Sequence, residues 1–179
     1  MTSSNDVVLS ETGVPLVEVN GQFTPLAPFH LTGIRKVIGS RNYAYLISSN
    51  GNLYRYTDPS GAPYHPGLTL VTINQNPRGG KLEKITTRSR VVDAVTDHFY
   101  PDVLAILYRD NTVEVYPVYG EYYETSSGGV EFREEYGNAV RYDSTPVDRI
   151  TMVGHYLTLT WRGTFVTDLV IAPTGEEQY

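Results

Sequence analysis

The chain has 179 residues, a formal net charge of −6 at pH 7 and no cysteine. This length allows one well-buried core and is short for two independent ones, so one domain is expected. The lack of cysteine excludes a disulfide framework and a thiolate metal site, so stability must come from burial or from assembly.

The first 33 residues predict an N-terminal arm that contains a hairpin. Segments 14–19 and 22–26 are rich in apolar residues and flank Asn20-Gly21, a pair that is typical of tight turns. Pro15 and Pro25 cannot donate hydrogen bonds to a ladder, so both segments are expected to be edge strands or an arm that lies on a neighbour.

The stretch from 34 to 57 predicts the central hairpin. Strands are expected at 34–37, 43–48 and 53–56, where β-branched and aromatic residues dominate. Asn50-Gly51 between the last two favours a two-residue turn with positive φ angles. A loop is expected at 58–63.

The chain then continues as another predicted hairpin. Residues 68–73 alternate as a strand does, and 82–87 predict a short strand after it. The polar, glycine-rich segment 74–81 between them predicts an exposed tip that carries Arg78 and Lys81.

Variants of the central stretch return twice, with a period of about 58 residues and roughly four strands per unit. Val92 begins the second copy, which continues with strands at 103–108 and 113–118 around Asp110-Asn111. Ile150 begins the third, with strands at 156–161 and 164–171 around Arg162-Gly163. One more hairpin is expected from 119–124 and 130–136. The predicted units are 34–90, 91–146 and 147–173 of a single all-β domain spanning 34–173, followed by a flexible tail at 174–179.

Residues 37–46 (VIGSRNYAYL) and 50–56 (NGNLYRY) together resemble a blade of the propellers typified by the regulator of chromosome condensation. They also resemble propeller modules of phage tail proteins. The resemblance covers about twenty residues and departs from the family near Asn42, where a histidine is usual, and at Tyr56-Thr57, where tryptophan-glycine is usual. It therefore implies a fold and carries over no functional residue. The predicted fold class is all-β: antiparallel four-stranded units arranged like a propeller, or a plain sandwich or barrel.

Three blades leave an open edge and an uncovered apolar face, because propellers usually close with about four to eight blades. The N-terminal arm or further copies of the chain would have to cover them. Residues 35–90 contain nine basic and two acidic residues, whereas residues 91–179 contain five basic and fifteen acidic ones. This asymmetry favours head-to-tail association in a ring, unless the strands distribute the charges over a solvated surface.

The search for chemistry finds no phosphate-binding loop, nucleophile elbow, zinc motif or calcium loop. The four histidines are far apart, and the carboxylates near 93–102 and 131–148 are typical of solvated loops, although a pair of them facing across a cleft would suit a glycosidase. We expect no catalytic residue, no metal and no cofactor.

Fifteen tyrosines against one tryptophan and five phenylalanines suit polar interfaces and sugar stacking. Sequence-specific nucleic-acid binding is disfavoured by the net charge. No segment is long enough to cross a bilayer, and none resembles a signal peptide.

The composition and the all-β prediction resemble those of accessory structural proteins of tailed-phage virions, because lysines are few and Tyr, Thr, Ser and Asn are abundant. This resemblance implies a non-enzymatic component of the virion, in a tail or on a capsid, assembled in the host cytoplasm with other virion subunits or copies of itself. A carbohydrate-binding module and a glycosidase are the alternatives. The candidate interface residues are Arg78, Lys81, Lys84, Arg88, Arg90, Tyr116, Tyr119, Tyr122 and Tyr123.

Overall fold

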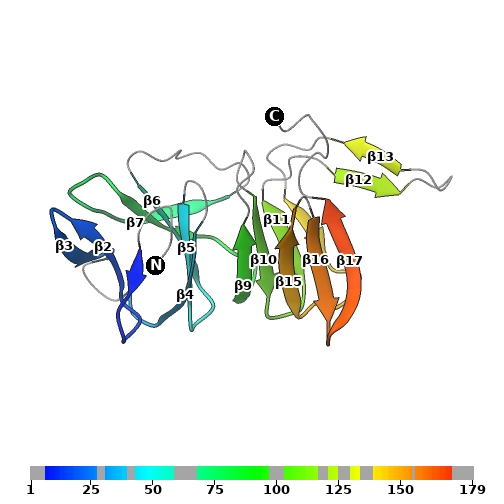
Figure 1. The fold of residues 1–179 in the computed structure, drawn as a ribbon, viewed down its shortest axis with the longest axis horizontal. Coiled ribbons are helices and arrows are strands. Elements are labelled where there is room, and N and C mark those ends of the chain that lie inside the picture. The colour runs from blue at the N-terminus through cyan, green and yellow to red at the C-terminus, as the bar shows by residue number, and fades with distance from the viewer. Residues whose placement is uncertain are drawn as a thin grey trace. The chain divides into compact units, whose positions relative to one another are not determined.

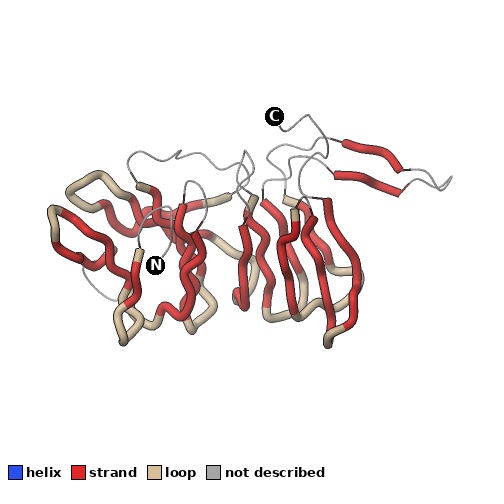
Figure 2. Tube along the Cα trace, in the orientation of Figure 1, coloured by secondary structure: helices blue, strands red, loops and turns tan. Residues whose placement is uncertain are grey.

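The computed structural model describes residues 7–27, 31–39, 43–58, 68–96, 103–116, 121–124, 130–133, 139–154 and 156–170. Within these ranges the chain forms seventeen strands and no helix (Figure 1). Figure 2 shows strands joined by short turns. The prediction of an all-β protein with antiparallel sheets is confirmed. None of the described residues belongs to a helix long and apolar enough to cross a bilayer.

Contacts between Cα atoms group the chain into two compact units. The first comprises residues 1–64 and 68–92, and the second comprises 65–67 and 93–179. The strands before residue 34 belong to the same unit as the strands that follow them, up to residue 92.

The first unit contains two antiparallel sheets. One has the order β1-β2-β3 and the other the order β4-β5-β6-β8-β7. The strands of the three-stranded sheet are β1 (Val8–Leu9), β2 (Pro15–Val19) and β3 (Gln22–Pro25). Those of the five-stranded sheet are β4 (Ile34–Gly39), β5 (Tyr43–Ser48), β6 (Leu53–Thr57), β7 (Leu70–Gln75) and β8 (Lys81–Ile85). A shared core of apolar side chains joins them, including Val17, Leu26, Leu46, Tyr56 and Leu82.

Two predictions for this unit are wrong in detail. The strand that begins at Pro15 lies between β1 and β3 and is not an edge strand. Proline is tolerated there because it is the first residue of the strand. The predicted tip at 74–81 is shorter, because β7 continues through Gln75 and β8 already begins at Lys81.

The second unit contains a four-stranded sheet of order β14-β11-β10-β9, a three-stranded sheet β15-β16-β17 and a hairpin β12-β13. The strands of the four-stranded sheet are β9 (Val91–Thr96, which begins in the first unit), β10 (Leu104–Tyr108), β11 (Val113–Tyr116) and β14 (Val140–Tyr142). The others are β12 (Glu121–Glu124), β13 (Val130–Arg133), β15 (Arg149–Val153), β16 (Tyr156–Trp161) and β17 (Thr164–Val170). The two larger sheets share a core that includes Ala105, Leu107, Val115, Leu157 and Leu159.

The predicted hairpin around Asn50-Gly51 is confirmed, but its turn has three residues, not two. Ser48 donates its N–H to the carbonyl of Asn52, and Gly51 donates to the carbonyl of Ser48. Only Gly51 within this turn has a positive φ, of 83°. Three-residue turns of this kind need the left-handed conformation only at their last residue.

The same turn occurs three times, at 11–13, 49–51 and 109–111. Each ends in a residue with positive φ, namely Gly13, Gly51 and Asn111. The carbonyl of each of these residues accepts a hydrogen bond from a backbone N–H further along the chain. The donors are Ile34 at the start of β4, Val91 at the start of β9, and Val147 just before β15. The turn at Arg162-Gly163 differs, since it has two residues and both have positive φ.

Candidate interaction surface

The basic candidates lie on or just after the β7–β8 hairpin. Arg78 is in the turn between the two strands, Lys81 and Lys84 are on β8, and Arg88 and Arg90 follow it. Since a strand rises about 3.3 Å per residue, Arg78 and Arg90 lie beyond opposite ends of a strand roughly 15 Å long. The structure therefore does not bring these five residues into one patch.

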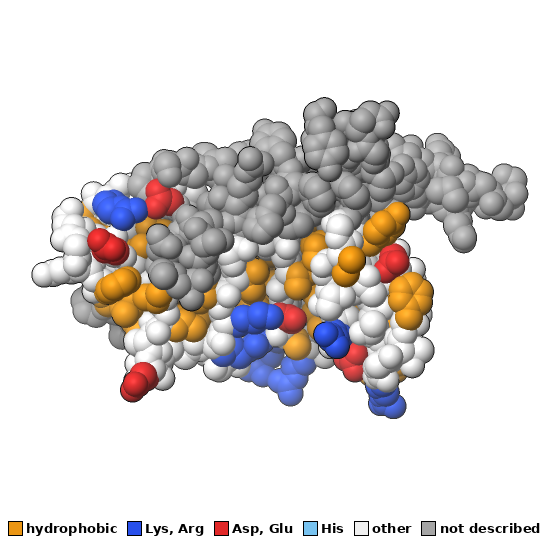
Figure 3. Space-filling model, viewed as in Figure 1, with side chains coloured by type: hydrophobic (Ala, Val, Ile, Leu, Met, Phe, Trp, Pro, Cys, Tyr) orange, Lys and Arg blue, Asp and Glu red, His pale blue; other side chains and the backbone are white. Residues whose placement is uncertain are grey.

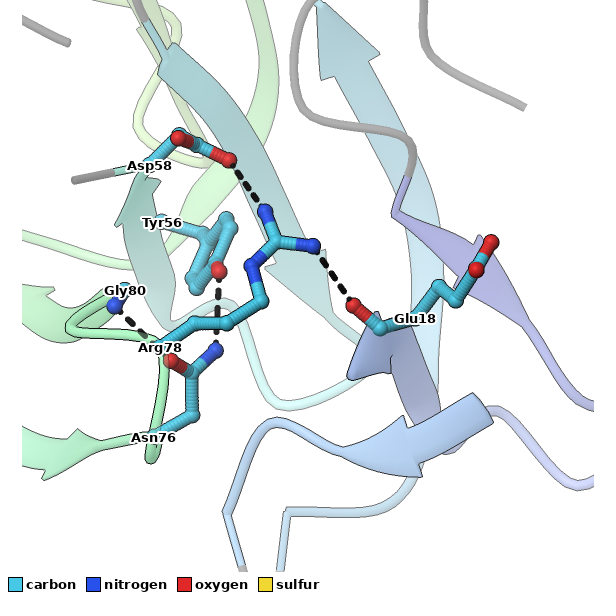
Figure 4. Close-up of polar contacts among 6 residues, drawn as sticks. All are labelled: Glu18, Tyr56, Asp58, Asn76, Arg78 and Gly80. Carbon is cyan, nitrogen blue, oxygen red and sulfur yellow. Dashed lines mark hydrogen bonds and ion pairs between the residues drawn. The ribbon is translucent and has the colours of Figure 1, made fainter. Parts of the chain in front are cut away.

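Arg78 connects three segments of the first unit. Its Nη2 lies 2.8 Å from Asp58 Oδ2, and its Nη1 donates a hydrogen bond of 2.8 Å to the carbonyl of Glu18 (Figure 4). The side chain of Arg78 is 41% exposed. Because both terminal nitrogens are used within the unit, Arg78 holds the β7–β8 turn against β2 and the end of β6.

A second network lies beneath Arg78. Asn76 Nδ2 donates to the hydroxyl of Tyr56 at 2.9 Å, and the N–H of Gly80 donates to Asn76 Oδ1 at 2.8 Å (Figure 4). Burial raises the pKa of Tyr56, since it penalises the charged phenolate, and the hydrogen bond from Asn76 opposes this effect. A Cβ on Gly80 would lie 2.0 Å from the Tyr56 hydroxyl, so the close packing requires glycine. The network fixes the turn that presents Arg78.

Lys81 lies beside a buried ion pair. Its Nζ is 3.8 Å from Glu83 Oε2, whereas Glu83 Oε1 is 3.0 Å from Arg55 Nη2. Arg55 and Glu83 are directly opposite each other on β6 and β8, and the Arg55 side chain is 1% exposed. The guanidinium also stacks over the ring of Tyr43, 4.3 Å from its centroid. This pair favours the observed register of β6 and β8, and no local pattern in the sequence predicts it.

Arg88 and Arg90 are exposed at the other end of β8. The Cα of Gly51 faces Arg90, and a Cβ on this glycine would lie 2.9 Å from the Arg90 Cβ. The exposed side chain of Arg35 donates a hydrogen bond through Nη2 to the carbonyl of Val92. Arg35 therefore reaches the chain two residues beyond Arg90, a contact between residues 57 positions apart that no local pattern in the sequence predicts.

The tyrosine candidates do not form a described cluster. Tyr116 ends β11, and its hydroxyl donates to Glu114 Oε2 at 2.9 Å. Tyr122 and Tyr123 are on β12, whose backbone pairs with β13. Tyr119 and the side chains of β12 lie outside the described part of the chain, so glycan binding by these residues stays a prediction.

Three of the candidate carboxylates, Asp93, Asp143 and Asp148, have partners within the described residues. Asp148 accepts the N–H of Arg162 with both oxygens, at 3.1 and 3.2 Å, and Asp143 lies 3.4 Å from Arg141. Asp93 accepts the N–H of Ala94. The four histidines lie outside the described residues, and within the described residues no group of three or more His, Asp or Glu side chains is placed to hold a metal.

Large apolar side chains remain exposed on both units, and Figure 3 shows such side chains between charged ones on one face of the molecule. In the first unit, Val71 and Ile73 on β7 are 55% and 44% exposed. In the second, Val153 and Phe165 are 63% and 61% exposed. Both sets lie on strands at the edge of a sheet.

Comparison of the chain with models of known protein families and with curated proteins finds no match.

Proposed function

We propose that this protein is a non-enzymatic assembly component of a tailed-phage particle, in a tail or on a capsid, and that it acts through protein–protein contacts. The observation that carries the proposal is the exposure of Val71, Ile73, Val153 and Phe165 on edge strands of antiparallel sheets. Exposed apolar groups beside unpaired strand edges are the features that β-rich proteins bury on association.

The recurrent turn supports a blade-like arrangement within this proposal. Three times, the carbonyl of a turn residue accepts a hydrogen bond from a backbone N–H further along the chain. Repeated contacts of this kind between successive units would hold a stack of blades together. In such a stack each sheet packs its apolar faces against the neighbouring sheets. The last sheet has one face without a neighbour, and this face can bind a partner. The virion assignment itself rests on composition: few lysines and abundant tyrosine, threonine, serine and asparagine.

Mass spectrometry of purified particles tests the assignment. The chain should be present in particles produced by the phage whose genome encodes it, at a fixed ratio to a structural subunit after density-gradient purification. A chain that is abundant in the infected-cell lysate and missing from the particles would refute the proposal. Genes for portal, tail or capsid proteins beside its own gene would support it, and metabolic genes on both sides would contradict it.

A further inference from the structure

Strand β7 differs from the other edge strands of the described sheets. It has six residues, Leu70–Gln75, with no charged side chain and no proline. Edge strands normally avoid unwanted pairing by being short or by having charges or proline. Each of the other edge strands uses one of these devices. Strand β1 has only two residues, and β3 ends in Pro25. The remaining edge strands contain charged residues: Arg35 and Lys36 on β4, Asp93 on β9, Arg141 on β14, Arg149 on β15, Asp168 on β17, and glutamates on β12 and β13.

The middle of β7 is exposed, whereas Asn74 near its end is partly buried and donates a hydrogen bond of 2.6 Å to the carbonyl of Leu26. Val71, Thr72 and Ile73 are consecutive and all exposed, although they alternate between the faces of the strand. Ile73 is the extra residue of a bulge opposite β8. Within the described residues, β8 is the one strand that pairs with β7. The outer edge of β7 therefore offers a backbone and apolar side chains for pairing.

The ladder with β8 shows which backbone groups face outward. Thr86 donates its N–H to the carbonyl of Thr69, so this pair is hydrogen-bonded. Hydrogen-bonded and non-hydrogen-bonded pairs alternate along an antiparallel ladder. Val71 therefore bonds toward β8, whereas Thr72, which is opposite Glu83, directs its N–H and C=O away from β8. Among the described strands none pairs with these groups on Thr72, so an added strand can use them.

Charge identifies the class of strand that would fit. The first unit, which contains β7, has nine basic and five acidic residues, a formal charge of +4. The second unit has five basic and fifteen acidic residues, a formal charge of −10. Pairing β7 with β7 of another copy would bring two basic units together. Pairing it with an edge of the second unit would join opposite charges, which favours and orients association.

Strand β17 is the edge of the second unit that suits this role. It is seven residues long and pairs with β16 on one side. Its single charge, Asp168, accepts a hydrogen bond of 2.7 Å from the hydroxyl of Thr158 on β16, so the neighbouring strand holds this carboxylate. Its Phe165 is 61% exposed. Trp161 and Thr164 close a two-residue turn and form a hydrogen-bonded pair, so the N–H of Phe165 in the next pair points away from β16.

We propose that β7 of one copy pairs with β17 of a second copy, so that a sheet continues from one subunit into the next. This inference deepens the proposed assembly function and names its partner as the chain itself. The two surfaces are different, so the contact is heterologous, and its repetition builds a ring or an open filament.

The test uses proline, which removes the outward N–H and leaves the inner ladder intact. In sedimentation velocity, the wild-type chain should form oligomers that grow with concentration and weaken as salt rises. Thr72→Pro and Phe165→Pro should each be monomeric. An equimolar mixture of the two should form dimers and nothing larger, because each variant retains one intact edge.

A charge variant covers the case in which a proline variant does not fold, which circular dichroism will show. Val71→Glu, which brings a negative charge against the acidic second unit, should abolish oligomers, whereas Val153→Glu, which places the same charge on an exposed valine of edge strand β15, should leave them unchanged. A monomeric wild type, a mixture that stays monomeric, or equal effects of the two glutamate variants would overturn the proposal. A monomeric chain that is still found in particles would overturn this pairing and leave the proposed function standing.

Discussion

Removing one partner of the buried ion pair between Arg55 and Glu83 should destabilise the first unit strongly, because the other charge is then left buried. At an N–O distance of 3.0 Å, two unit charges attract by about 5 kcal/mol at an effective dielectric constant near 20. Glu83→Gln removes this attraction and leaves the guanidinium buried, a change that typically costs about 3–5 kcal/mol. Stacking of Arg55 on Tyr43 remains in the variant, so we expect a loss at the lower end, about 3 kcal/mol.

Urea unfolding followed by far-ultraviolet circular dichroism measures this loss. The matched control is Asp143→Asn, which breaks the ion pair between Arg141 and Asp143. Those two side chains are 48% and 55% exposed, so the control should cost less than about 1 kcal/mol. A third variant with Arg55→Met and Glu83→Leu removes both charges and should recover much of the stability lost in Glu83→Gln.

Two results would refute this reasoning. A loss in Glu83→Gln no larger than that in Asp143→Asn would mean that the buried pair contributes no more than an exposed one. A loss in the double variant equal to the sum of the losses in Arg55→Met and in Glu83→Leu, each made alone, would mean that the two charges act independently of each other.

Two further predictions concern the turns of the first unit. Gly51→Ala should destabilise more than Gly21→Ala in urea unfolding, because both glycines have positive φ but only Gly51 faces a close neighbour, Arg90; equal losses would show that backbone strain alone decides. Burial raises the pKa of Tyr56 in the folded state, so the unfolded chain ionises this group first. The stabilisation is complete below the unfolded pKa near 10 and is lost as pH rises through the folded pKa. Tyr56→Phe should cost about 1 kcal/mol at pH 8 through the lost bond to Asn76 and should flatten the decline in the free energy of unfolding above pH 10; an unchanged decline would contradict this.

The local elements could be predicted from the sequence because turn chemistry and side-chain alternation act over a few residues. The hairpins around Asn20-Gly21, Asn50-Gly51 and Arg162-Gly163 are all present. Their turn lengths were harder to predict, because Asn-Gly fits a two-residue turn at 20–21 and the end of a three-residue turn at 49–51. Which one forms depends on the register of the flanking strands.

The candidate site was only partly predictable, for a physical reason. The sequence predicts Arg78 to be an exposed basic residue in the turn between two strands. Its side chain instead bonds to Asp58, 20 residues away, and to the carbonyl of Glu18, 60 residues away. Arg55 lies between apolar neighbours in the sequence, a pattern that predicts a side chain facing solvent. It is buried because β6 pairs with β8, which places Glu83 opposite it although the two residues are 28 positions apart. A single sequence does not encode such pairings in any local pattern.

The sequence by itself determined the strands, the hairpins and the uneven distribution of charge, because these follow from the residue types and their spacing. Only the tertiary structure decided that β8 lies between β6 and β7, since that order depends on which strands bury the most apolar surface together. The insertion leaves β7 at an edge without charge or proline. The site of assembly that we infer is thus a consequence of strand order.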